Sequence, residues 1–184
     1  MRHPIDWLAL RAVSFQANRL YRRFLAAAEN AAAVQDQVLR HHLAINADSD
    51  FARRRRIHRI RHYDDFRRAI PITTYATYKP AIEKLQQGYP RALLGVGQKL
   101  LMFAMTSGTT DTAKYIPVTE QSLADYRRGW LVFGIKAFSD HPAAILRPIL
   151  QISSPAEESR TEGNIPCGAI TGLLARTQKG IVRR

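Results

Sequence analysis

Apolar residues recur every three or four positions over residues 5–28, which is the spacing of one face of an α-helix. Arginines lie on the opposite side, and the apolar stripe consists of Leu10, Val13, Ala17, Leu20, Tyr21, Phe24 and Ala28. A second helix is expected over 31–45, where Val34, Val38 and Ile45 offer a matching face. We therefore predict an antiparallel helical pair, with the stripe used for packing rather than for attachment to a membrane surface.

Two shorter helices are expected next. Asp64 is placed to cap a helix that ends at Ile70, because Pro71 disfavours helical geometry in the residue before it. Thr74 is placed to cap another, which extends to about residue 87 and ends at a left-handed Gly88. Because a proline inside a helix costs about 3 kcal/mol, Pro80 favours a start near residue 79.

From residue 99 the pattern alternates between strand and helix. The apolar run 99–105 predicts a strand, 119–138 a helix and 145–152 a second strand, which a right-handed crossover would place parallel to the first. The predicted fold class is α/β, with amino-terminal helices followed by a strand-phosphate loop-helix-strand unit. We expect a single domain with a helical pair (1–48), a helical and loop segment (49–98), the phosphate-loop unit (99–153) and a loop-rich end (154–184), where the structure of 170–175 stays open.

Residues 106–114 (TSGTTDTAK) follow the first of these strands directly. Glycine allows backbone N–H groups to converge on an anion, hydroxyls add donors, and lysine adds charge. The position after a strand puts the loop at the carboxyl end of a sheet. We predict that it binds the phosphates of a nucleoside triphosphate, through Thr106, Ser107, Gly108, Thr109, Thr110 and Lys114. The spacing between Gly108 and Lys114 excludes the Walker pattern.

The loop resembles the phosphate loop of the adenylate-forming superfamily. Other stretches resemble, within it, the auxin-responsive-promoter family of acyl-acid amido synthetases: 69–75 (AIPITTY) with 80–82 (PAI), 114–119 (KYIPVT), 125–130 (DYRRGW), 150–156 (LQISSPA) and 163–168 (GNIPCG). Together they cover most of 34–178.

The resemblance implies a function. In this family a carboxylic acid attacks ATP, with Mg²⁺ assisting, and an amine such as an amino acid then captures the acyl adenylate. The helix after the loop lines the acyl pocket in the family, which makes Tyr126, Trp130 and Phe133 candidate substrate contacts, with core packing as the alternative. Family members are much longer, so we expect this chain to be an amino-terminal portion of an adenylate-forming large domain. We expect no turnover by the chain alone. Its expected partner is the missing carboxyl-terminal portion of the same enzyme.

One position departs from the superfamily pattern. Asp111 stands where glycine is usual and would bring a like charge close to bound phosphate. At about 6 Å, such a charge costs roughly 0.7 to 3 kcal/mol, depending on the effective dielectric constant. Magnesium could offset this repulsion, and an inactive fragment of the family stays an open alternative.

The formal charge is +13, and 53–56 (RRRR) with Arg59 and Arg61 concentrate much of it. A basic nucleic-acid-binding protein is therefore the rival hypothesis, although stacking on bases would require aromatics that the run lacks, and a solvated or ion-paired surface is favoured. His58 and His62 have the spacing of zinc ligands, but the arginines around them argue against a metal site.

The single cysteine, Cys167, excludes an internal disulfide and fits a reducing compartment, so a cytoplasmic protein is expected. We assign no chemistry to this thiol because no histidine lies near it in the sequence. No apolar run reaches the length of a membrane span, and no signal peptide is recognisable.

Overall fold

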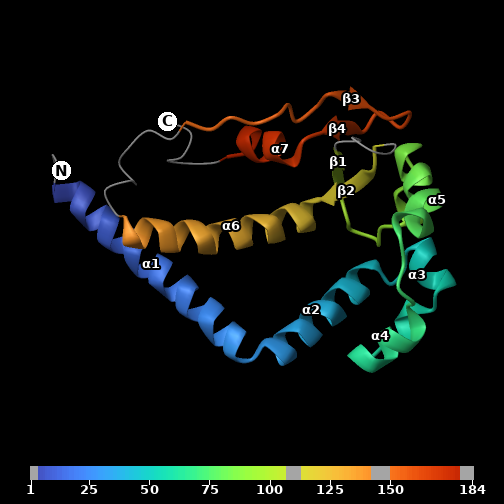
Figure 1. Cartoon of the computed structure of the whole chain (residues 1–184), viewed down its shortest axis with the longest axis horizontal. Helices are drawn as coiled ribbons and strands as arrows, with labels where there is room; N and C mark the ends of the chain where they lie inside the picture. The colour runs from blue at the N-terminus through green and yellow to red at the C-terminus, as the bar shows by residue number, and fades with distance from the viewer. Residues whose placement is uncertain (1–3, 107–112, 142–149, 179–184) are drawn as a thin grey trace. The chain divides into compact units, whose positions relative to one another are not determined.

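A computed structural model describes residues 4–106, 113–141 and 150–178, with side chains from Phe15 onward except Gln16. Two compact units divide the chain: unit 1 contains Met1–Gln35 and Ala124–Ile149, and unit 2 contains Asp36–Leu123 and Leu150–Arg184. The fold is mixed α/β, as predicted (Figure 1). Within the described residues, no helix is long and apolar enough to cross a bilayer.

The amino-terminal helices form where the apolar periodicity predicts them. Helix α1 spans Pro4–Glu29 and α2 spans Ala31–Asn46, within one or two residues of the predicted bounds. Their antiparallel pairing stays a prediction, because α1 belongs to unit 1 and most of α2 to unit 2.

Several short helices follow in unit 2: α3 (Asp50–Arg54), the 3-10 turn η1 (Ile57–Arg59), α4 (Tyr63–Ala69), α5 (Tyr75–Gln86) and the 3-10 turn η2 (Pro90–Ala92). The N-cap of α4 is His62, so the prediction that Asp64 caps this helix is wrong. Asp65 reaches back instead, and its carboxylate accepts the N–H groups of Arg61 and His62 at 3.1 and 3.2 Å. The Arg61 N–H, with the neighbouring Arg68, lowers the pKa of Asp65.

Helix α5 begins at Tyr75 with Thr74 as its N-cap, so the predicted start near Lys79 is also wrong. Pro80 lies inside the helix. Pro80 and Ala76 are both exposed, so the hydrogen bond that the Ala76 carbonyl loses lies on the exposed side of the helix. The opposite face of α5 buries Ala81, Ile82 and Leu85, which compensates for the proline. Gly88 ends the helix at a φ of 93°, as predicted.

The described strands form one mixed sheet in the order β2-β1-β4-β3. Strand β1 (Leu100–Met105) confirms the expected strand, and β2 (Tyr115–Thr119) is an antiparallel partner that the sequence pattern did not predict. Pro117 argues against a strand, but β2 lies at the edge, where a missing N–H costs no ladder bond. Helix α6 (Glu120–Asp140) follows, close to its predicted bounds.

The expected parallel partner of β1 exists but is a different segment. Strand β4 (Pro166–Gly168) pairs parallel with β1, and β3 (Ser159–Arg160) pairs antiparallel with β4. The predicted strand 145–152 is not the partner: 145–149 lie outside the described residues, and Leu150 and Ile152 form no strand and are about nine-tenths exposed (90% and 91%). An apolar run does not specify pairing, which depends on distant backbone groups.

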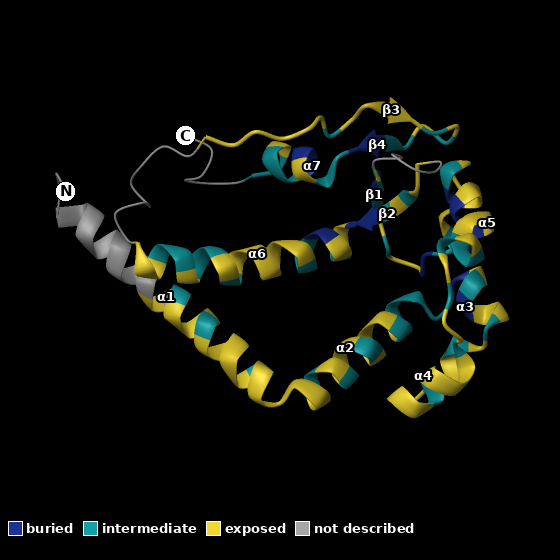
Figure 2. Cartoon of the chain, viewed as in Figure 1, coloured by how far each residue is buried: buried dark blue, intermediate teal, exposed yellow. Residues whose placement is uncertain are grey.

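All fully buried side chains of the described residues belong to unit 2 (Figure 2). One face of the sheet packs against α5, through Phe103 and Cys167 of the sheet and Ile82 and Leu85 of the helix. The other face of the sheet packs against the start of α6 and against α7 (Ile170–Arg176), through Met102, Val118, Leu123 and Leu173. Glycines permit the close approaches that this packing needs: a Cβ on Gly172 would lie 2.3 Å from the Ser154 carbonyl oxygen.

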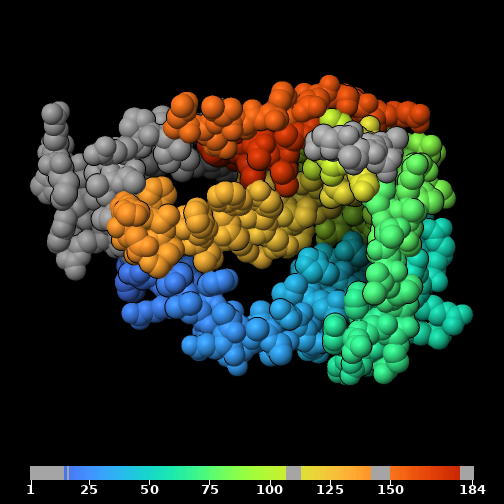
Figure 3. Space-filling model, viewed as in Figure 1, coloured from blue at the N-terminus to red at the C-terminus, as the bar shows by residue number. Residues whose placement is uncertain are grey.

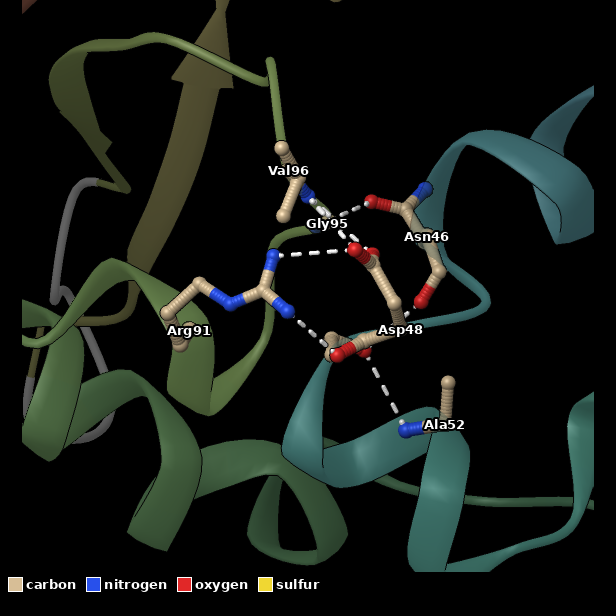
Figure 4. Close-up of polar contacts among 7 residues, drawn as sticks. Asn46, Asp48, Ala52, Arg91, Gly95 and Val96 are labelled. Carbon is tan, nitrogen blue, oxygen red and sulfur yellow. Dashed lines mark hydrogen bonds and ion pairs between the residues drawn. The ribbon is translucent and has the colours of Figure 1, made fainter.

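A polar cluster joins the end of α2 to the chain before β1 (Figure 4). The Asp48 carboxylate accepts the Val96 N–H at 3.0 Å and Nη1 of Arg91 at 3.2 Å. The Asp48 carbonyl oxygen accepts Nη2 of Arg91 at 2.7 Å, and Asn46 Oδ1 accepts the Gly95 N–H at 3.2 Å. These bonds connect the end of α2 to the chain that leads into β1, all within unit 2.

Candidate functional site

The predicted phosphate loop is closed at its base by the first and last of its residues. The Thr106 N–H donates to the Lys114 carbonyl at 3.2 Å, and the Lys114 N–H donates to Oγ1 of Thr106, also at 3.2 Å. We call these two residues the stem. Both lie in unit 2, at the end of the β1–β2 hairpin. The structure therefore brings the two ends of the motif together.

The other predicted loop residues, Ser107, Gly108, Thr109 and Thr110, lie outside the described residues, as does Asp111. Their proposed contacts with phosphate stay predictions.

The stem presents a cation and a hydroxyl to solvent. Lys114 is exposed, and its ammonium has no acidic partner within the described parts of the chain. Thr106 is also exposed, and its hydroxyl oxygen accepts a backbone N–H while its own proton has no acceptor among the described residues. An anion at the stem would find both a charge and a donor.

An open depression of about 630 Å³ lies between the stem and α5. Figure 3 shows the atoms of α5 and of the β1–β2 hairpin forming a continuous surface in this part of unit 2. Two lysines, Lys79 and Lys114, belong to its lining, which consists of Thr74, Tyr75, Ala76, Lys79, Glu83, Gln86, Ala113, Lys114 and Tyr115. Lys79 is only loosely paired with Glu83, at 4.0 Å.

Tyr75 connects α5 to Tyr115, the residue that follows the stem, and sequence reasoning did not single it out. Its hydroxyl accepts the Tyr115 N–H at 3.0 Å and donates to the Tyr115 carbonyl at 3.4 Å. The Tyr115 ring in turn meets the buried Phe103 ring edge to face, with centroids 6.1 Å apart. Tyr75 lies in one of the family-like stretches and Tyr115 in another, but nothing in their spacing indicates that they touch.

The three candidate substrate contacts form a row along α6 in unit 1. Ring centroids are 6.4 Å apart between Tyr126 and Trp130 and 5.8 Å apart between Trp130 and Phe133. Trp130 and Phe133 are 57% and 65% exposed, and Tyr126 is exposed as well. Whether these residues contact substrate or pack in a core stays a prediction.

The arginine-rich segment crosses the end of α3 rather than forming one helix. Arg55 is the C-cap of α3 and packs over the Phe51 ring, and Arg56 has a φ of 54°. The remaining arginines are exposed and have no ion pair within the described parts of the chain: Arg53, Arg54, Arg56, Arg59 and Arg61. We expected this arginine-rich segment to form either a solvated or an ion-paired surface, and the described residues show a solvated one.

The described histidines and acids form no cluster of three that could hold a metal ion. Cys167 is buried, and desolvation raises the pKa of its thiol, which opposes formation of a reactive thiolate.

The comparisons with known proteins address the family. No curated protein matches the chain significantly in sequence. A model of the GH3 family N-terminal domain matches residues 20–183, which is most of the chain and includes the stem, α5 and the sheet. Consistent with the motifs and the mixed α/β fold, the chain belongs to the GH3 family of auxin-responsive-promoter acyl-acid amido synthetases.

Proposed function

We propose that the chain binds Mg·ATP at the stem and serves the adenylation of a carboxylic acid, as the amino-terminal part of an acyl-acid amido synthetase. The observation that carries this proposal is the pairing of Thr106 with Lys114. Among the described residues, this lysine has no acidic partner and the Thr106 hydroxyl proton has no acceptor. The family match to an acyl-acid amido synthetase domain supports the assignment.

The proposed reaction has two steps. A carboxylate oxygen of the acid forms a bond to the α-phosphorus of ATP, the bond from that phosphorus to the bridging oxygen breaks, and pyrophosphate leaves with magnesium. The amine nitrogen then bonds to the acyl carbon, AMP leaves, and the amine proton passes to solvent. Mg²⁺ enters as part of the nucleotide substrate and shares the charge of the leaving phosphates.

The stem residues hold the leaving group in this scheme. The Lys114 ammonium neutralises charge that develops on the pyrophosphate, and the Thr106 hydroxyl donates a hydrogen bond to a phosphate oxygen. Because hydrogen bonds fix the stem directly after β1 and directly before β2, it need not reorganise when the charge develops. Ser107, Gly108, Thr109 and Thr110 would supply further donors.

The acyl group and the amine are assigned by class only. Tyr126, Trp130 and Phe133 offer an apolar surface, so we propose that they contact the hydrocarbon part of the acid. The amine acceptor, such as an amino acid, has no described residue that identifies it.

Binding of Mg·ATP to the chain tests the proposal directly. Lys114→Ala removes a charge-assisted contact, so the Kd for Mg·ATP should rise roughly ten- to a hundredfold. Lys84→Ala is the matched control, since Lys84 is an exposed lysine of α5 outside the lining of the depression. Isothermal titration of the parent and both variants gives the comparison.

A second change has the opposite sign. Asp111→Gly should lower the Kd for Mg·ATP, because it removes a like charge and restores backbone freedom to the loop. If Asp111→Gly binds no better than the parent and Lys114→Ala binds as well as the parent, the loop does not hold phosphate in this protein.

The rival function is binding of nucleic acid, and the five exposed arginines without ion pairs in the described structure favour it as a second candidate. Replacing residues 53–56 with glutamine should leave the affinity for Mg·ATP unchanged. If the run binds DNA, the slope of log K against log salt should fall by about one for each phosphate that an arginine no longer neutralises. Salt-resistant binding of a defined sequence would replace the adenylation proposal with this one.

A further inference from the structure

The hydroxyl of Tyr75 occupies the outer edge of the sheet at the point where the phosphate-loop motif ends. On an antiparallel strand, residues alternately direct their N–H and C=O groups toward the partner strand and away from it. Lys114 uses both groups toward Thr106, so the next residue, Tyr115, directs both groups outward, away from β1. Because β2 lies at the edge of the described sheet, those groups face no other strand among the described residues.

The Tyr75 hydroxyl satisfies both of these groups at once, because it accepts from the Tyr115 N–H at 3.0 Å and donates to the Tyr115 carbonyl at 3.4 Å. A phenol has one donor and an acceptor oxygen, so it can pair with a donor and an acceptor on the same residue. Phenylalanine fills the same space without either capacity.

Tyr75 is itself held by the core of unit 2. Tyr75 and Tyr115 are both partly buried and pack against the cluster around Phe103, Leu85 and Ile82. Tyr75 is also the first residue of α5, directly after the N-cap Thr74. The hydroxyl is therefore presented from a fixed helix and a fixed ring rather than from a mobile surface side chain.

Lys114 consequently lies between two anchors. On one side its own backbone is bonded twice to Thr106, and on the other side the following residue is bonded twice to Tyr75. The Lys114 side chain is exposed beside the depression that Tyr75 also lines. Fixing the backbone on both sides limits the directions in which the ammonium can lie.

We propose that Tyr75 is a positioning residue for phosphate binding: its hydroxyl fixes the backbone of Tyr115 and so holds Lys114 in place for the phosphates of ATP. This role rests on the proposed function. It assigns Tyr75 no contact with the nucleotide, since the residue acts through the strand.

The same helix supplies a matched control. Tyr78 is also partly buried on α5, and its hydroxyl bonds to Oγ1 of Thr73 at 2.8 Å instead of to Tyr115. Tyr115→Phe is a second control, because the bonds from Tyr75 use only the backbone of Tyr115. Removing either of these hydroxyls should leave the stem intact.

The experiment measures two properties of the full chain for each variant: the Kd for Mg·ATP and the exchange rate of the Tyr115 amide hydrogen. Tyr75→Phe should weaken binding of Mg·ATP by about two- to tenfold, the range expected for neutral hydrogen bonds. The Tyr115 amide should exchange faster, while the amides of β1 should be unaffected. Tyr78→Phe and Tyr115→Phe should match the parent in both measurements.

A merely structural role would change these readouts differently. General loosening would accelerate exchange throughout α5 and β1, and it would overturn the proposal. If Tyr75→Phe does not fold, 4-aminophenylalanine at this position retains the ring and an N–H donor but loses most of the acceptor capacity that the Tyr115 N–H uses. This variant should bind Mg·ATP about two- to tenfold more weakly than the parent, and binding equal to that of the parent would overturn the role.

The two proposals fail in different ways. A parent chain that binds no Mg·ATP would overturn the proposed function and this role together. A parent that binds Mg·ATP, with Tyr75→Phe binding equally well, would overturn the role of Tyr75 alone.

Discussion

The two compact units of this chain use their apolar residues in opposite ways. In unit 2, Phe103 and Leu85 are fully buried between the sheet and α5, and Met102 is buried on the other face of the sheet. In unit 1, the described side chains of α1 and of α6 from Ala124 onward are not buried. Large apolar residues such as Phe15, Trp130 and Phe133 are exposed there.

The difference shows that an apolar pattern predicts an apolar helix face but does not predict whether that face is buried. The helical spacing on α1 predicts that one face will be apolar, and the helix forms as predicted. Burial requires a second element of complementary shape, which α5 and the sheet supply in unit 2. Apolar periodicity therefore identifies the apolar face of a helix in either unit. Only in unit 2 do the described residues show which element packs against that face.

The largest test of this contrast compares two phenylalanines. Phe103→Ala should reduce the free energy of unfolding by about 3 to 5 kcal/mol, because it opens a cavity in a closely packed core. Phe133→Ala should change it by less than about 0.5 kcal/mol, since that ring is mostly exposed. Urea denaturation of both variants measures the difference. Equal losses would mean that unit 1 has a core of its own and would remove the contrast.

Replacing two glycines with alanine should give smaller changes in stability, of opposite sign. Gly172→Ala in α7 should destabilise the chain by about 1 to 3 kcal/mol, because the added Cβ would lie 2.3 to 2.7 Å from backbone atoms of residues 154–156. The added Cβ of Gly129→Ala in α6 meets no atom within 4 Å in the described parts of the chain. This change should instead stabilise the chain by about 0.5 to 1 kcal/mol through helix propensity. Thermal unfolding followed by circular dichroism reports both signs. A stabilising Gly172→Ala would contradict the close packing of α7 in unit 2.

The smallest expected effect concerns pH and the polar cluster of unit 2. The Val96 N–H, and with it the Arg91 guanidinium, lowers the pKa of Asp48 below its ordinary value. Because the pKa of Asp48 is lower in the folded state, the ionised carboxylate stabilises the fold fully at pH values above its pKa in the unfolded chain, about 3.9. That stabilisation is lost as the pH falls through the pKa of Asp48 in the folded state. Asp48→Asn should therefore flatten the decline of stability in acid. The measurement is the urea midpoint between about pH 5 and pH 2.

Glu162→Gln serves as the control for that series, because Glu162 is exposed and has no ion pair within the described residues. Its acid profile should follow that of the parent. An Asp48→Asn profile indistinguishable from the parent would show that the cluster contributes nothing that depends on charge.

Much of the fold and part of the site could be predicted from the sequence. Local patterns predicted strand β1, helices α1, α2 and α6 and the left-handed Gly88. The family followed from the hydroxyl-glycine motif together with the other family-like stretches. The reason is that apolar spacing, caps and glycine act over a few neighbouring residues. The roles of the loop residues in binding ATP stay predictions.

Only the tertiary structure decided which segments pair. Pro117 fits into β2 because that strand lies at the edge of the described sheet. Pro80 fits into α5 because it lies on the exposed side of the helix while Ile82 and Leu85 are buried. Strand β4 rather than residues 150–152 joins β1, and Tyr75 meets Tyr115 across 40 positions of sequence. Each outcome depends on backbone groups brought together by burial of a shared core, and no short stretch of sequence contains both partners.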